Sequence, residues 1–130
     1  MEFTSENTGT KIVINPCSFQ EAFRLKSAIQ KALLKNNVSL EAALEQDITS
    51  LILAIDSDEG ILECMFDCLK KSTYDGIKIT KDTFEDESAR GDLYDIFFQC
   101  LKVNIYPFFK PLLSRFGIEL KAPKMGESQK

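Results

Sequence analysis

Apolar residues recur at steps of three and four along most of this 130-residue chain. This period places side chains on one face of an α-helix, whereas a strand requires steps of two. The pattern predicts helices at about 18–35 and 39–55, a third from a start within 56–59 to about 71, and a last one from Asp92 onward. A compact, mainly helical domain is the fold class that follows.

The first helix has a defined start at Ser18-Phe19-Gln20-Glu21. This order matches a capping box, in which the Ser18 hydroxyl and the Glu21 carboxylate each accept a hydrogen bond from a backbone N–H. Helix caps are also expected within 56–59 and at Thr80. The core-facing residues expected on the first helix are Phe19, Ala22, Phe23, Ala28, Ile29, Ala32 and Leu33.

Two short segments have strand character. The first, KIVIN at 11–15, is rich in β-branched residues and ends at a proline. The second, IKIT at 77–80, alternates over four residues after a turn at Tyr74-Asp75-Gly76. We therefore expect one or two short strands, near the N-terminus and in mid-chain, which could pair with each other.

Composition divides the chain into three parts. Residues 1–10 are polar and contain a glycine, so we expect a flexible N-terminus. Residues 11–117 hold the periodic segments and should form a single helical domain. Residues 118–130 are polar, with a proline and a glycine, and are expected to be disordered.

Pro107 interrupts the last periodic segment. A proline inside a helix removes a hydrogen bond and clashes with the preceding turn, so we expect a kink or restart between Asn104 and Pro107. Pro107 would then open a new helix, and Pro111 would be tolerated if it still lay in the first turn. Gly117 would end that helix.

Half of the ten phenylalanines lie between Phe97 and Phe116. One helical stripe accounts for Leu93, Phe97, Cys100, Leu101, Ile105, Phe108 and Leu112. The remaining apolar side chains spread over a wide arc, and they form the predicted partner interface: Phe98, Tyr106, Phe109, Leu113 and Phe116. A helix apolar over most of its circumference is either buried on several sides or contacts a partner. The sequence leaves both alternatives open.

The residue types argue against catalysis. The chain has no histidine, which excludes a Cys/His zinc site, a Ser-His-Asp triad and a Cys-His nucleophile pair. It also lacks the glycine-rich phosphate-binding motifs and the EF-hand spacing. Paired acids such as Asp56 and Glu59 are explained as helix caps. We therefore predict no enzymatic activity, no cofactor and no metal.

The four cysteines are Cys17, Cys64, Cys68 and Cys100. The N-terminus lacks the features of a secretory signal, and no apolar run approaches the about 20 residues that span a bilayer. These observations predict buried free thiols in a cytosolic protein that does not enter a membrane.

The net charge of −4 is unevenly distributed. Residues 41–95 contain fifteen acids and five bases, residues 1–40 three acids and five bases, and residues 96–130 two acids and six bases. Such separation favours a partner of complementary charge or head-to-tail association with a second copy, although solvated acidic faces are an equally simple explanation. The basic residues form no clear nucleic-acid stripe, so no nucleic-acid partner is predicted.

Several segments together resemble the small tail assembly chaperones of long-tailed bacteriophages. They are the Asn-Pro strand end, SFQEAFRLKSAIQKAL, the acidic middle, IKITKDTFEDES and LYDIFFQCLKVNIYPFFKPLLSRFG, which together span about 11–117. The closest parts are 84–86 and the block at 102–109. These motifs are structural, and the resemblance supplies no catalytic or binding residues.

The resemblance implies a helical, non-enzymatic protein of the infected host cytoplasm that is absent from the mature virion. It implies binding to the tape measure protein, which would be kept soluble, and help in recruiting the major tail protein for tube assembly. The alternative is a small acidic adaptor or inhibitor that binds a host protein. Self-association is also left open.

Overall fold

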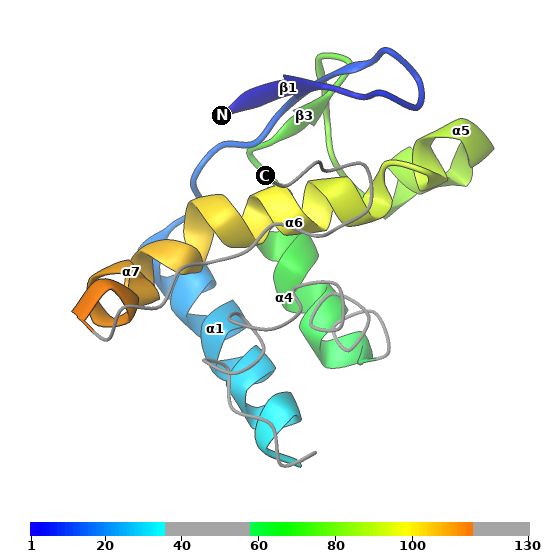
Figure 1. Ribbon diagram of the computed structural model, residues 1–130. Helices are drawn as coiled ribbons and strands as arrows, with labels where there is room; N and C mark the ends of the chain where they lie inside the picture. The colour runs from blue at the N-terminus through cyan, green and yellow to red at the C-terminus, as the bar shows by residue number, and fades with distance from the viewer. Residues whose placement is uncertain (36–57, 116–130) are drawn as a thin grey trace.

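The computed structural model describes residues 1–35 and 58–115, and helix α6 (Leu93–Asn104) runs across its middle (Figure 1). A small sheet lies on one side of α6, and helices α1 (Phe19–Lys35) and α4 (Glu59–Leu69) extend from the other side. The mainly helical fold class is confirmed. The helix expected at 39–55 and the tail at 118–130 lie outside the described residues.

The sheet contains four antiparallel strands in chain order. They are β1 (Glu2–Thr4), β2 (Lys11–Val13), β3 (Thr73–Tyr74) and β4 (Ile77–Lys78). Both predicted strands are present in shorter form, but β3 lies between them, so their direct pairing was wrong.

Strand β1 was not predicted, because residues 1–10 were expected to form a flexible end. In the structure Phe3 pairs with Ile12 of β2 and packs against the core. Three residues are too few to show an alternating pattern, so this strand depends on its partner rather than on a local signal.

The turn between β3 and β4 confirms the prediction at Tyr74-Asp75-Gly76. Asp75 has φ 56° and Gly76 has φ 80°. A two-residue hairpin loop whose central residues both have positive φ matches the right-handed twist of the flanking strands, and Asp-Gly is a favoured pair for this loop.

The predicted helix starts are confirmed. Ser18 N donates to Glu21 Oε1 and Glu21 N donates to Ser18 Oγ, each at 3.1 Å. Asp58 Oδ1 accepts from Ile61 N at the start of α4, and Thr80 caps the short 3-10 helix η1 (Lys81–Glu85).

The sequence Ala89-Arg90-Gly91 indicates a loop, but the structure makes most of this segment helical. Helix α5 (Glu87–Arg90) includes its first two residues, and Gly91 is the C-cap of that helix. Asp86 caps the start of α5, since its carboxylate accepts from Ser88 N. The helical turn therefore extends into the segment where a loop was expected.

The helix restart before Pro107 is also confirmed. Helix α6 ends at Asn104, and α7 (Tyr106–Arg115) begins two residues later. Pro111 was expected to be tolerated if it lay in the first turn of the new helix. This expectation was wrong, because Pro111 lies inside α7, beyond its first turn. Both prolines are exposed, so water can satisfy the carbonyl that Pro111 leaves without a backbone donor.

The core surrounds α6. The buried residues of this helix lie on several of its faces: Ile96, Phe97, Phe98, Cys100, Leu101 and Asn104. They pack with buried residues from β2, α1 and α4, in one cluster. For α6, therefore, the wide apolar arc reflects burial on several sides. Of the predicted stripe, Leu93 and Phe108 are only partly buried.

Buried Asp92 connects the sheet to the start of α6. Its carboxylate accepts hydrogen bonds from Ser5 Oγ at 2.6 Å, Tyr74 OH at 2.7 Å and Thr8 Oγ1 at 3.2 Å. Asp92 is 1% exposed, so these donors replace the water that an isolated carboxylate would require. The β1–β2 loop is thereby fixed against the helical layer.

Candidate interaction surface

Three aromatic rings meet at the surface where α1 begins. Phe19 is 69% exposed and Phe23 is 45% exposed, and their ring centroids lie 5.6 Å apart. Phe108 of α7 is 6.0 Å from the first ring and 6.1 Å from the second. We call Phe19, Phe23 and Phe108 the aromatic patch.

The patch exists because two helices present their side chains at one place. Phe19 and Phe23 are four residues apart and therefore neighbours on one face of α1. The buried stripe of α1 is offset from them and contains Ala22, Leu25, Ile29 and Leu33. The expectation that Phe19 and Phe23 face the core was wrong, since α4 packs against α1 and the buried stripe is the offset one.

Asn104 holds the start of α1 close to the junction of α6 and α7. Its Oδ1 accepts from the backbone N of Cys17 at 2.9 Å, and its Nδ2 contacts Cys100 Sγ at 3.5 Å. Asn104 is buried, so both contacts form away from solvent. They anchor residues just before Phe19 to the end of α6, from which α7 carries Phe108.

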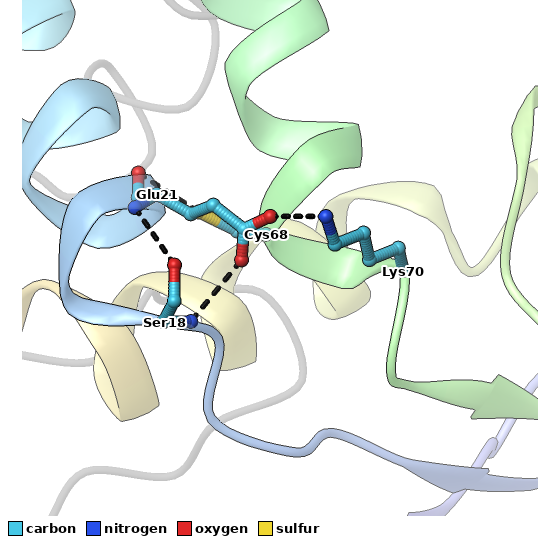
Figure 2. Close-up of polar contacts among 4 residues, drawn as sticks. All are labelled: Ser18, Glu21, Cys68 and Lys70. Atoms are coloured by element: carbon cyan, nitrogen blue, oxygen red, sulfur yellow. Dashed lines mark hydrogen bonds and ion pairs between the residues drawn. The ribbon is translucent and has the colours of Figure 1, made fainter.

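A second anchor links the first turn of α1 to the end of α4, as Figure 2 shows. Glu21 forms an ion pair with Lys70 while its other oxygen accepts from Ser18 N. Cys68 Sγ also donates to the Glu21 carbonyl at 3.4 Å. The Lys70 ammonium and then the Ser18 N–H lower the pKa of Glu21 to about 2.

Replacing Glu21 by Gln should reduce stability mainly at neutral pH. The folded-state pKa of Glu21 lies below its ordinary 4.5, so the ionised side chain stabilises the fold above about pH 4.5. This stabilisation is lost as the pH falls toward 2. Gln retains the capping interaction and removes only the charge.

Urea unfolding of wild-type protein and Glu21→Gln at pH 7, 4 and 2.5 measures the effect. The difference in free energy of unfolding should be largest at pH 7 and smallest at pH 2.5. Glu63→Gln is the matched control, because Glu63 forms an exposed ion pair with Lys81. Loss of this ion pair should change the free energy of unfolding by about 0.5 kcal/mol or less. A Glu21→Gln difference independent of pH would contradict the assignment.

The two helices that form the patch are strongly basic. Helix α1, FQEAFRLKSAIQKALLK, has four Lys/Arg and one acid, and α7, YPFFKPLLSR, has two Lys/Arg and no acid. The single acid is Glu21, which forms an ion pair with Lys70, the C-cap of α4. Lys26 Nζ lies 4.4 Å from the Phe23 ring centroid, so a cation borders the patch directly.

The cysteines are free, as predicted, and two of them, Cys68 and Cys100, are buried. Cys17 and Cys64 are only half-buried, which corrects the expectation for these two. Burial raises the pKa of Cys17 to about 12, and a hydrogen bond with Cys100 followed by burial raises that of Cys68. In the described ranges, no group of three potential ligands could hold a metal ion.

The structure places the predicted interface residues in different surroundings. Phe98 is 9% exposed and belongs to the core, and Tyr106 is partly buried against that core. Phe109 and Leu113 lie on α7, and Phe116 follows the last described residue. Their role at an interface stays a prediction. The sequence analysis did not identify Phe19 and Phe23 as surface residues. The alternative apolar stripe through Leu25 could have indicated that they are exposed.

Comparison with known proteins identifies the family. No curated protein and no solved structure matches the chain. Within the part of the chain that the structure describes, no helix is long and apolar enough to cross a membrane. The family model described as phage tail assembly chaperone protein, TAC, matches residues 9–117. This match covers most of the chain, and the protein therefore belongs to the phage tail assembly chaperones.

Proposed function

We propose that the protein binds the tape measure protein of its phage, keeps it soluble and helps recruit the major tail protein for assembly of the tail tube. The family supports a role in tail assembly. The observation that carries binding is the aromatic patch, because Phe19 and Phe23 remain exposed beside Phe108 in a folded chain. Exposed clusters of apolar side chains mark protein interaction sites.

The proposed activity requires binding without chemical turnover. A long, amphipathic helical client exposes apolar stripes until the tail tube encloses it, and a helical chaperone can cover such a stripe by helix-to-helix packing. We place this activity in the host cytoplasm, with the chaperone released before the virion is complete. The protein then acts as a non-enzymatic assembly factor.

The predicted interface residues extend this proposal along α7. Tyr106 is partly buried at the start of that helix, near the position of Phe108 in the chain. We propose that Tyr106, Phe109, Leu113 and Phe116 enlarge the client surface, and that Phe98 supports it from the core. Aromatic residues supply large contact areas at low entropic cost, which suits them to this role.

Co-expression with the tape measure protein tests the proposal. The soluble fraction of that protein should rise several-fold when the chaperone is present, and the two should co-purify. An unrelated aggregation-prone phage protein serves as the control client, and its solubility should not change. An unchanged soluble fraction of the tape measure protein would contradict the proposal and favour an adaptor that binds a host protein.

A further inference from the structure

We propose that the aromatic patch docks an amphipathic helix that carries Asp or Glu along the edge of its apolar face. This inference rests on the proposed function, since it takes the helix to be a segment of the tail-assembly client. It adds the place of contact and the chemistry of the bound segment. Three observations support the proposal: the surface formed by the rings, the basic charge of the helices that carry them, and the poorer fit of the described segments of a second copy.

The three rings form a single apolar surface. The three ring centroids lie 5.6, 6.0 and 6.1 Å apart. Rings at these centroid distances are in contact, so they form one continuous apolar surface. The apolar stripe of an amphipathic helix can pack on such a surface.

The charge of the two helices that carry the patch favours an acidic partner. Helices α1 and α7 carry six Lys/Arg, and their single acid, Glu21, is paired with Lys70. Lys26 borders the Phe23 ring and donates to the neutral Gln30 side chain at 2.9 Å. Within residues 1–35 and 58–115, none of the ion pairs involves Lys26. A carboxylate on the edge of a docked helix would complement this ammonium.

Of the segments that the structure describes, none makes a second copy of the chain a better fit to the patch than a client helix. Its acidic helix α4 supplies negative charge, but the apolar residues Ile61, Met65 and Leu69 of that helix are buried in its own core. The described part of the acidic middle is 58–95. Among its large hydrophobic residues, the exposed one is Ile77 of β4. Within residues 1–35 and 58–115, a copy therefore offers acids without an exposed apolar helix face beside them, whereas an amphipathic client helix offers both.

Two synthetic helices test the chemistry of the partner. Each has about 20 residues, enough for stable helix formation when bound, with Leu at steps of three and four and one Trp. One peptide carries Glu beside the Leu stripe, and the other carries Lys at the same positions. The protein contains no Trp, so peptide fluorescence reports binding directly. The Glu peptide should bind about 10-fold more tightly or better, with a smaller ratio at high salt.

The variant Phe19→Ser with Phe23→Ser tests the place of contact. Both side chains are exposed, so the core should remain intact, which circular dichroism and urea unfolding verify. Affinity for the Glu peptide should fall about 10-fold or more, as expected for central aromatic contacts. Ile77→Ser is the matched control, because it also replaces an exposed apolar residue, on β4, and should bind as wild-type protein does.

Three results would overturn the inference. They are equal affinity for the Glu and Lys peptides, wild-type affinity of the double variant, and a patch-dependent dimer that forms without peptide binding. The co-expression assay separates this inference from the proposed function. If wild-type protein and double variant keep the tape measure protein equally soluble, the function stands and the docking site is wrong. If wild-type protein does not raise the soluble fraction of the tape measure protein, the proposed function is wrong. The peptide titrations then test the docking chemistry independently.

Discussion

Replacing Phe97 by Ala should lower the free energy of unfolding by about 3–5 kcal/mol, the range typical of a large aromatic side chain removed from a core. Phe97 is fully buried in α6, and its ring lies 6.0 Å from Phe66 of α4 and 6.4 Å from Tyr94. Both pairs have edge-to-face geometry, which adds to the burial of apolar area. The substitution would leave a cavity at the centre of the fold.

Urea unfolding measures this loss. Domains of this size have stabilities of about 5–15 kcal/mol, so the variant should lose a large fraction of its stability and about 10–20 °C in Tm. Phe19→Ala is the control, because it removes the same ring from an exposed position and should change stability by about 1 kcal/mol or less. A Phe97→Ala variant as stable as that control would show that the core refills the cavity.

Local signals explain which parts of the fold were predictable. The interaction between Ser18 and Glu21 spans three residues, and Asp58 reaches only to Ile61, so neither depends on distant contacts. The helix restart before Pro107 likewise follows from the covalent geometry of proline. These features are encoded in short stretches, and the structure has them where the sequence places them.

The sheet and the exposure of α1 depend on distant segments. Val13 pairs with Thr73, sixty residues away in the chain, and strands of two or three residues carry no recognisable pattern. Helical spacing identifies apolar faces but does not say which face another helix will cover. Phe19 and Phe23 are exposed because the buried stripe of α1 runs through Leu25 and Ile29 instead. The patch therefore required the packing of α1 to be known.

Asp92 shows the same limit for a polar residue. The sequence placed it correctly at the start of the last helix, where an acid is common. Its carboxylate instead accepts from Ser5, 87 residues earlier in the chain, and from Tyr74 of β3. Nothing in the local sequence distinguishes a buried acceptor from an ordinary first-turn acid, so its structural role could not be predicted.

Replacing Asp92 by Ala should lower the free energy of unfolding by about 2–4 kcal/mol. The substitution removes the carboxylate that accepts hydrogen bonds from three hydroxyl groups, those of Ser5, Thr8 and Tyr74. Asp92 is buried, with 1% of its surface exposed. Thr8 Oγ1 keeps Thr10 Oγ1 as an acceptor at 2.8 Å, so the loss falls mainly on Ser5 and Tyr74. A buried donor left without an acceptor destabilises a fold by about 1–3 kcal/mol, and such costs are not additive. Urea unfolding measures the total. Faster hydrogen exchange of Ser5 N, which donates to Thr10 O, should locate the loss in the β1–β2 loop.

Tyr74→Phe is the matched control for this carboxylate. It removes one of the three hydroxyl donors and leaves Asp92 bonded to Ser5 and Thr8, so it should reduce stability by about 1–2 kcal/mol without faster exchange at Ser5 N. The double variant should be little less stable than Asp92→Ala alone, because the Tyr74 hydroxyl has already lost this acceptor. Full additivity of the two substitutions would mean that the Tyr74 contact stabilises the fold independently of Asp92, and the carboxylate would then not be the centre of this connection.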